Sequence, residues 1–100
     1  MLIIYGWDEN DFRCVPCLKA KRLAQVKEFE YEFVPLAKEN ITDEHKSNRI
    51  ELEERLMSIG VELKTLPQIF DGDELIGGWT EFKASVNEWA RVQWERTEHK

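Results

Sequence analysis

Two cysteines, Cys14 and Cys17, stand in the segment Cys14-Val15-Pro16-Cys17 of this 100-residue chain. An apolar run precedes the segment and a helical pattern follows it, so the cysteines fall where a strand passes into a helix. Two thiols at this spacing can close into a small disulfide and open again. At such a junction the pair predicts a dithiol redox site.

Length and composition predict one folded domain over residues 1–100. Charged residues make up 34% of the chain, but they are interspersed with 42% hydrophobic residues, which is typical of a folded domain. The net charge of -6 argues against binding to nucleic acid or to an anionic membrane surface. No apolar stretch approaches the roughly 20 residues that span a bilayer.

The first five residues, Met1–Tyr5, lack the positive charges of a signal peptide. A single close cysteine pair also suits a reducing compartment, since secreted disulfide scaffolds carry more bridges with wider loops. We therefore expect a cytoplasmic protein, and we expect it to be a monomer.

The first half of the chain predicts two strands that flank a helix. The strands are Leu2–Tyr5 and Tyr31–Val34, the second stopped by Pro35. The helix begins near Val15 and has Pro16 in its first turn, where a missing N–H costs little. Residues at helical spacing are expected to face the core: Cys17, Ala20, Leu23 and Ala24.

The second half predicts a helix, a hairpin and a last helix. Thr42 or Asp43 caps the first of these helices, and Gly60 ends it. Asp71-Gly72 is typical of a tight hairpin turn. The other expectations are strands over Gln68–Phe70 and Glu74–Ile76, a last helix from about Thr80 with Phe82, Val86, Trp89 and Ala90 inward, and a frayed tail from about residue 95.

The element order is therefore β-α-β-α-β-β-α. A strand-helix-strand unit favours a parallel pair, and the hairpin adds an antiparallel pair. The predicted fold class is α/β, with a four-stranded mixed sheet flanked by three helices.

The chemistry of the pair follows from its place at the start of a helix. Unpaired N–H groups and the helix dipole stabilise a thiolate at Cys14, and the cation of Arg13 adds to this effect. Cys17 lies one turn further in, so we expect it to be more buried and less acidic. Cys14 then attacks a target disulfide, and Cys17 attacks Cys14 to release the reduced target.

Two other interpretations of the pair stay open. Zinc needs four ligands, and the further candidates are His45 and His99, which have no paired spacing. The thiols can also be inert parts of the core or form a structural disulfide. We expect no metal site.

The chain resembles the glutaredoxin family of the thioredoxin fold over roughly residues 1–94, and it is most similar to the small phage-encoded glutaredoxins. The resemblance rests on an early Tyr-Gly, the cysteine pair, a Leu-Pro turn before a strand and a double glycine before the last helix. These segments are Tyr5-Gly6, Cys14-Val15-Pro16-Cys17, Ala20-Lys21-Arg22-Leu23, Thr65-Leu66-Pro67-Gln68-Ile69-Phe70 and Gly77-Gly78-Trp79-Thr80.

The resemblance implies a glutathione groove beside the cysteines. It implies that the Leu66-Pro67 bond is cis and that the backbone of Leu66 pairs with glutathione or a substrate peptide. It implies that Gly77 and Gly78, at a helix start, hold the γ-glutamyl end, where free N–H groups suit a carboxylate. The other residues placed at the groove are Tyr5, Arg13 (or Lys19 or Lys64 in the same basic role), Val15, Pro16, Trp79 and Thr80. Trp7 and Trp79 are interpreted as one patch that receives partner proteins.

The implied activity is dithiol–disulfide oxidoreduction on protein disulfides or glutathione mixed disulfides. Glutathione is the co-substrate, no cofactor is bound, and ribonucleotide reductase is the implied client, with glutathione reductase or thioredoxin reductase as further partners.

Two departures from the family pattern keep alternatives open. Val15 and Pro16 stand where the family has proline and then an aromatic residue, and the acid after the double glycine comes late, at Glu81. A thioredoxin-like donor recycled by thioredoxin reductase is one alternative. An iron–sulfur-cluster-binding module is another.

Overall fold

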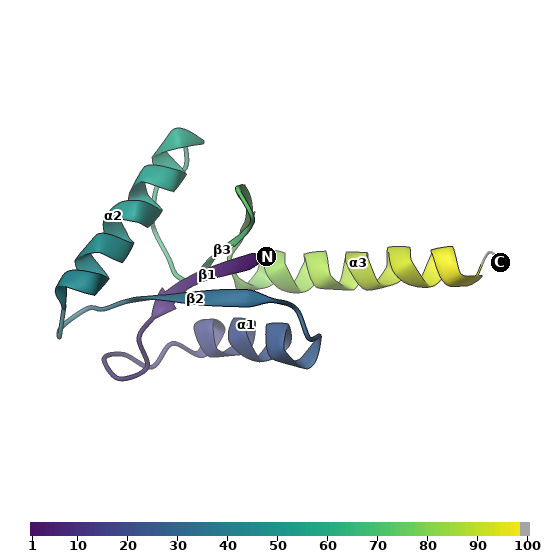
Figure 1. The fold of residues 1–100 in the computed structure, drawn as a ribbon, viewed down its shortest axis with the longest axis horizontal. Coiled ribbons are helices and arrows are strands. Elements are labelled where there is room, and N and C mark those ends of the chain that lie inside the picture. The colour runs from purple at the N-terminus through teal and green to yellow at the C-terminus, as the bar shows by residue number, and fades with distance from the viewer. Residues whose placement is uncertain (99–100) are drawn as a thin grey trace.

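Strand β1 (Leu2–Trp7) lies inside a four-stranded sheet of order β2-β1-β3-β4. The structure, a computed structural model, describes the backbone of residues 1–98 and the side chains of residues 1–91. β1 runs parallel to β2 (Tyr31–Leu36) and antiparallel to β3 (Gln68–Asp71), which pairs antiparallel with β4 (Glu74–Gly77). The predicted element order and mixed sheet are confirmed (Figure 1).

Two hydrophobic clusters cover the two faces of the sheet, because neighbouring residues of a strand point to opposite sides. Ile4 belongs to the cluster under α1 (Val15–Val26) and α3 (Trp79–Glu98), and Tyr5 to the cluster under α2 (Asp43–Ser58). Figure 1 shows α2 on one side of the sheet and α1 on the other. The first cluster contains Leu2, Ile4, Ala20, Ala24, Ile69, Phe82 and Val86, and the second Tyr5, Val34, Leu36, Leu52, Leu56 and Phe70.

Helix ends and the hairpin follow the local sequence. Thr42 is the N-cap of α2, and its side chain accepts a hydrogen bond from the N–H of His45 at 3.2 Å. Gly60 follows that helix with a φ of 73°, which suits glycine. Gly72, at 61°, turns the chain between β3 and β4.

Both strands of the parallel pair are longer than expected. β1 continues through Gly6 to Trp7, and β2 passes through Pro35 to Leu36. The prediction that Pro35 stops its strand is wrong because β2 lies at the edge of the sheet. An edge strand needs no N–H on its outer side, so proline is tolerated there.

The last helix differs most from expectation. α3 runs from Trp79 to Glu98, past the expected end near residue 95, and residues 99–100 lie outside the described part. Trp89 is 38% exposed and Ala90 is exposed, so the prediction that both face inward is wrong. Trp89 instead meets Phe29 edge to face at 5.8 Å. The C-terminal part of the helix projects beyond the sheet (Figure 1), and Trp89 lies at a surface hollow that Leu2 and Phe29 also line.

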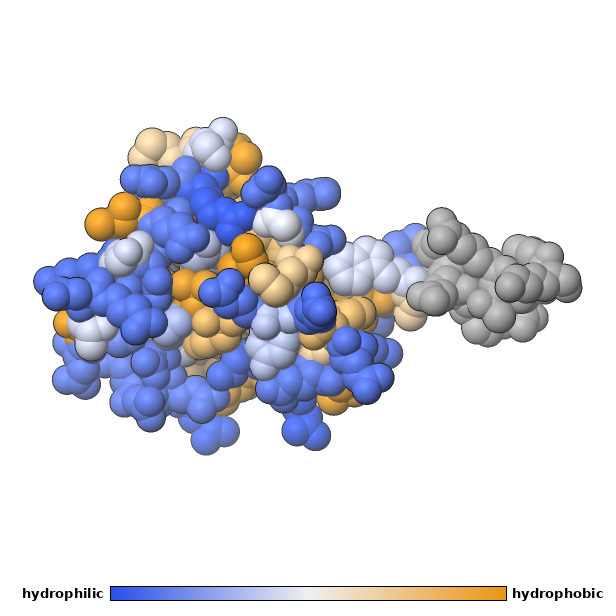
Figure 2. Space-filling view, in the orientation of Figure 1, coloured by the Kyte–Doolittle hydropathy of each residue, from blue (hydrophilic) through white to orange (hydrophobic). Residues whose placement is uncertain are grey.

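The outer surface carries the charges that the composition predicts. The face in Figure 2 is mostly hydrophilic, with separate apolar areas between the polar side chains. Within the described residues, no helix is both long and apolar enough to cross a membrane.

Candidate active site

The cysteine pair lies at the start of α1, as predicted. Cys14 and Cys17 are joined by a disulfide, and their Cα atoms are 5.2 Å apart. Cys14 is the N-cap residue of the helix, and its Sγ accepts a hydrogen bond from the N–H of Cys17 at 3.2 Å. The first sulfur therefore sits at the positive end of the helix dipole, where an anion is stabilised.

The two cysteines differ in exposure. Residue Cys14 is 7% exposed and residue Cys17 is 1% exposed, so Cys14 is the one nearer to an incoming disulfide. Pro16 lies in the first turn of the helix, and Val15 between the cysteines is exposed. Unequal access at one helix start suits a pair in which one thiol attacks and the other resolves.

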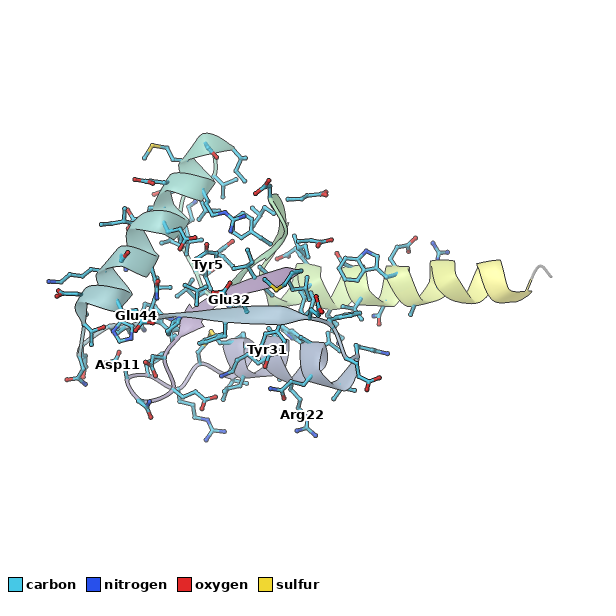
Figure 3. The ribbon with its side chains drawn as sticks, in the orientation of Figure 1. Tyr5, Asp11, Arg22, Tyr31, Glu32 and Glu44 are labelled. Carbon is cyan, nitrogen blue, oxygen red and sulfur yellow. A yellow bond between two sulfur atoms is a disulfide. The ribbon has the colours of Figure 1, made fainter. Side chains whose placement is uncertain are left out.

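A loop of acidic residues leads from β1 to Cys14, and Asp11 anchors it. The Asp11 carboxylate accepts hydrogen bonds from the N–H groups of Lys38 at 2.6 Å and Asn40 at 2.7 Å, and from that of Glu39. These N–H groups, that of Asn40 first, lower the pKa of Asp11 below its usual value. Figure 3 shows Asp11 near the start of α2. Sequence analysis missed this role because the partners lie far along the chain.

Asp8 begins the same loop. Its carboxylate accepts hydrogen bonds from the N–H of Asn10 at 2.9 Å and from Nε2 of His45 at 3.1 Å. The Asn10 N–H first, and then His45, lower the pKa of Asp8, so it is an anion at neutral pH. The loop is thereby tied to both the turn that follows and the first turn of α2.

The Leu66-Pro67 peptide bond is cis, which confirms the expectation from the resemblance. Pro67 is buried and Leu66 is half-buried. The start of α3 lies beside this turn, since a Cβ atom placed on Gly78 would be 3.5 Å from the carbonyl oxygen of Pro67. The Leu-Pro turn and the double glycine are therefore neighbours in space.

Glu81 takes part in the N-terminal cap of α3. Its Oε1 accepts a hydrogen bond from the N–H of Gly78 at 2.8 Å, as the third residue of a helix does in a capping box. The carboxylate also lies against Gly77, where a Cβ atom would come within 2.9 Å of the Glu81 side chain. The acid expected after the double glycine is thus present, supplied one position later in the sequence.

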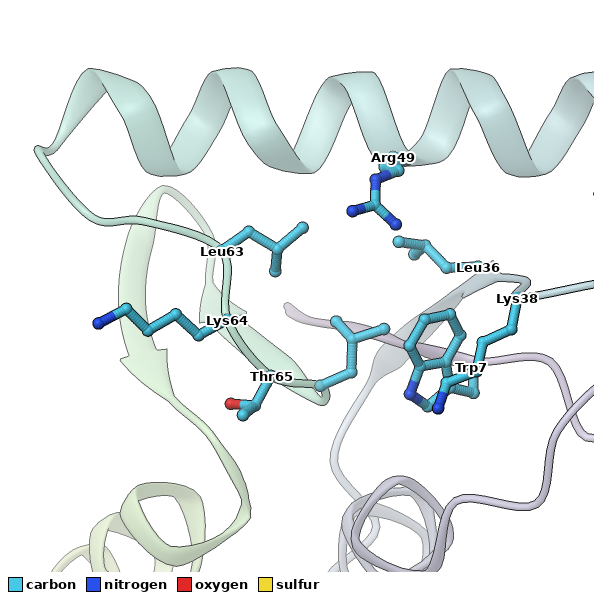
Figure 4. Close-up of a pocket in the computed structure, with 8 residues that line it drawn as sticks. Trp7, Leu36, Lys38, Arg49, Leu63, Lys64 and Thr65 are labelled. Carbon is cyan, nitrogen blue, oxygen red and sulfur yellow. The ribbon is translucent and has the colours of Figure 1, made fainter.

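A pocket of about 310 Å³ flanks Leu66 on the α2 side of the sheet. Its apolar lining comes from Trp7 and three leucines, and its charges are all positive (Figure 4). Lys38 also lies over the ring of Phe12 at 3.8 Å. The lining residues are Trp7, Leu36, Lys38, Arg49, Leu63, Lys64, Thr65 and Leu66.

Of the three basic candidates, Lys64 lines this pocket. Arg13 lines a separate hollow with Glu9 and Leu18, and Lys19 is exposed on α1. Sequence analysis missed Lys38 and Arg49 as pocket residues, because lysine and arginine on a polar loop or helix carry no distinguishing pattern.

Tyr5 is fully buried beneath α2 (Figure 3). Its hydroxyl accepts a hydrogen bond from Nη1 of Arg55 at 3.1 Å, and burial raises its pKa above the usual value. Because Tyr5 has no exposed surface, it does not reach the surface where the resemblance implies a glutathione groove. Trp7 and Trp79 pack against different clusters on opposite faces of the sheet, which does not support a single patch.

A zinc site at the cysteines would need further ligands, for which the sequence offers His45 and His99. His45 binds Thr42 and Asp8, and His99 lies outside the described residues. In the part of the chain that the structure describes, no group of three or more histidine, cysteine and acidic side chains is placed to hold a metal.

Comparison with known proteins identifies a family with the same cysteine chemistry. Residues 2–76 match the glutaredoxin family model. The glutaredoxin of Enterobacteria phage T4 is 35% identical over 89 residues, which cover 83% of this chain and 95% of the relative. These matches confirm the resemblance that the sequence motifs indicate.

Two solved structures share the fold. Reduced Escherichia coli glutaredoxin has a TM-score of 0.61 and 32% identity, covering 87% of this chain and 93% of that one. A buckwheat glutaredoxin–glutathione complex has a TM-score of 0.63 and 20% identity, covering 92% of this chain and 73% of that one. The fold class is therefore thioredoxin-like, as predicted. The chain belongs to the glutaredoxin family, and Cys14 and Cys17 form the redox pair of a dithiol thiol–disulfide oxidoreductase.

Proposed function

We propose that this protein is a glutathione-dependent oxidoreductase that reduces protein disulfides and glutathione mixed disulfides. One observation carries the proposal: Cys14, the more exposed residue of the pair, is the N-cap of α1, and its sulfur accepts a hydrogen bond from the N–H of Cys17. This contact stabilises a thiolate once the disulfide is opened. Ribonucleotide reductase is the client class that the family resemblance suggests.

On a protein disulfide, the Cys14 thiolate attacks one client sulfur and the other client sulfur leaves as a thiolate. The Cys17 thiolate then attacks Cys14, which releases the second client sulfur and forms the Cys14–Cys17 disulfide. Two glutathione thiols reopen that disulfide and become one glutathione disulfide. On a glutathione mixed disulfide, Cys14 attacks the glutathione sulfur, the client thiolate leaves, and a second glutathione resolves the product.

Several groups support a glutathione groove beside Cys14. The backbone of Leu66 precedes the cis Pro67 and is available to pair with the backbone of the tripeptide. The γ-glutamyl end carries one carboxylate and one ammonium. The N–H groups that open α3 suit the carboxylate, and Glu81 suits the ammonium. We retain Gly77, Gly78, Trp79 and Thr80 in this site and leave Tyr5 out.

The cationic pocket suits the other end of glutathione. Lys38, Arg49 and Lys64 line it next to Leu66, and the glycine end of glutathione is a carboxylate. In a chain of net charge -6, positive groups gathered at one pocket favour an anionic ligand there. Val15 and Pro16 remain at the rim beside Cys14, and Arg13 is placed near it by its position in the chain.

The solution setting that we propose is a monomer in a reducing compartment, the cytoplasm. The support is the single cysteine pair, which needs a reductant to turn over.

The deciding experiment measures turnover of a glutathione mixed disulfide by the parent, Cys14→Ser and Cys17→Ser. We expect Cys14→Ser to be inactive. We expect Cys17→Ser to retain activity on the glutathione substrate and to lose it on a protein disulfide. Parental activity in Cys14→Ser contradicts the assignment of the nucleophile. A parent that ignores glutathione but accepts electrons from thioredoxin reductase is a thioredoxin-like donor instead, and a brown, cluster-bearing preparation indicates the iron–sulfur alternative.

A further inference from the structure

His45 is a buried histidine near the start of α2. It is 8% exposed, and it occupies the third helical position, where capping boxes usually have glutamate or glutamine. Its Nδ1 accepts a hydrogen bond from the N–H of Thr42 at 3.1 Å. A backbone N–H is always the donor, so Nδ1 carries no proton. The ring proton is therefore on Nε2, which donates to Oδ2 of Asp8 at 3.1 Å.

This contact joins two distant parts of the chain, because Asp8 precedes His45 by 37 positions. Asp8, the first residue of the loop before the cysteines, also makes several of the backbone hydrogen bonds of this loop. Its carbonyl oxygen accepts the N–H groups of Asp11 at 3.0 Å and Phe12 at 2.9 Å, and its own N–H donates to Leu36 at 2.7 Å. The backbone of the loop is thus folded around Asp8, and Phe12 stands two residues before Cys14.

The loop has two further anchors. Asp11 binds the N–H groups of residues 38–40. Glu9 pairs with Lys21 of α1 at 3.1 Å. Three acidic side chains of one loop therefore reach three different segments, and each anchor limits how far the residue at the start of α1 can move.

We propose that His45 is a positioning residue for Cys14, acting through Asp8, an inference that rests on the proposed role of Cys14 as nucleophile. The hydrogen bond from Nε2 holds the loop so that the Cys14 sulfur stays at the N-cap after the disulfide opens. The thiolate then keeps the N–H of Cys17 and the helix dipole. Without the His45–Asp8 contact, the loop loses its link to α2 and the sulfur is held at that place for less of the time.

The chain offers a matched control on the same helix. Nδ2 of Asn48, one turn after His45, donates to the carbonyl oxygen of Pro35 at 2.8 Å. This bond also ties α2 to the sheet, but it does not reach the loop that carries Cys14. Asn48→Ala therefore removes a comparable tether and leaves the proposed one intact.

The test compares His45→Ala and Asn48→Ala in a Cys17→Ser background, in which Cys14 is the reactive thiol. Alanine removes the imidazole and with it the link to Asp8, while the backbone N–H of residue 45 can still donate to the hydroxyl of Thr42, so this part of the helix cap is kept. The reduced proteins are alkylated with iodoacetamide across pH, and their thermal unfolding is followed in parallel.

We expect His45→Ala to raise the apparent pKa of Cys14 and to slow its alkylation at pH 7 by about threefold or more, the size of a helix-end effect on an anion. Asn48→Ala should lower thermal stability to a similar degree and keep the parental alkylation profile. If the parent has a low Cys14 pKa and His45→Ala has the same low pKa, the positioning role of His45 is overturned and the nucleophile assignment stands. A parental pKa at the ordinary value of about 8.5 contradicts the nucleophile assignment itself. Equal slowing in both variants shows that only general stability is at work.

Discussion

Gly6 of β1 lies directly against the sulfur of Cys17. A Cβ atom on Gly6 would be 3.1 Å from Cys17 Sγ and 2.9 Å from a ring carbon of Phe33. The backbone of β1 therefore packs directly against the sulfur of Cys17. This close approach explains why a residue without a side chain stands at this point of a buried strand.

Gly6→Ala is expected to destabilise the protein by about 1–3 kcal/mol, because the added methyl group overpacks a closed site. It also displaces the sulfur of Cys17, so reduction of a protein disulfide slows more than reduction of a glutathione mixed disulfide. Urea unfolding and the two turnover assays measure these effects. Gly60→Ala is the control, since that glycine has a φ of 73° with open space around it. It should lose stability and keep both activities. Parental stability in Gly6→Ala contradicts the contact.

Glu81→Ala is expected to raise the KM for a glutathione mixed disulfide about two- to fivefold at unchanged kcat, the range of an exposed ion pair. The carboxylate lies at Gly78, where the ammonium of the γ-glutamyl group is proposed to bind. A cysteinylglycine mixed disulfide lacks that group, so its KM should not change. Glu88→Ala removes a charge further along α3 and serves as the control. A lower KM in Glu81→Ala indicates that the carboxylate competes with the ligand.

The cations of the pocket beside Leu66 give a prediction that depends on salt. Arg49→Ala and Lys38→Ala should each weaken binding of glutathione substrates about two- to fivefold at low ionic strength. The difference from the parent should shrink at high salt, because salt screens exposed charges. KM values at two salt concentrations test this, with Lys46→Ala on the same helix as the control. A Lys46→Ala effect equal to that of Arg49→Ala indicates a general charge effect instead of a pocket.

Asp11 predicts how stability depends on pH. Its pKa is lowered in the folded state by the N–H groups of Asn40 and Lys38, so the unfolded chain binds more protons in acid. The stabilisation is fully present above the unfolded pKa of about 3.9 and is lost as pH falls through the lower, folded value. Asp11→Asn should therefore melt below the parent at pH 7, and the two melting temperatures should converge in acid. A constant gap across this range contradicts the prediction.

Arg55 links α2 to the sheet and to the hairpin. It donates to the hydroxyl of Tyr5 at 3.1 Å and to the carbonyl oxygen of Gly72 at 2.6 Å, and it lies over the ring of Phe70 at 4.1 Å. Arg55→Ala should cost about 2 kcal/mol in the free energy of unfolding, because the buried hydroxyl loses the hydrogen bond that Arg55 donates.

The same pair can be tested by a double-mutant cycle. Tyr5→Phe alone should cost about 1 kcal/mol, and the double variant should cost less than the sum of the two. Denaturant unfolding gives the four values. Strict additivity would show that the hydroxyl and the guanidinium do not interact.

Local patterns were enough to predict much of this protein. The cysteine pair at a helix start, the cap at Thr42 and the turn at Gly72 depend on residues within a few positions of one another. Backbone conformation and helix capping act over such distances, so the element order and the redox pair follow from sequence. The prediction of a cis bond before Pro67 rested on the family resemblance, because few X-Pro bonds in folded proteins are cis.

Burial at the ends of elements was less predictable. Periodicity predicts that Trp89 faces inward, yet this residue is 38% exposed and lies at a surface hollow with Leu2 and Phe29. The family resemblance places Tyr5 at a groove, yet Tyr5 is fully buried in the hydrophobic cluster under α2. The sequence pattern predicts which face of a helix or strand a side chain lies on. Whether that face is buried or exposed depends on the element packed against it.

By itself the sequence determined the thiol pair, its place at the N-terminus of a helix and the order of strands and helices, because each depends on short-range backbone preferences. Tertiary structure decided which charges meet. Asp8 reaches His45, and Asp11 reaches the N–H groups before α2. Lys38 and Arg49 face the same pocket. Such contacts join residues far apart in the chain, and their hydrogen bonds and charges exist only once the sheet has brought those segments together.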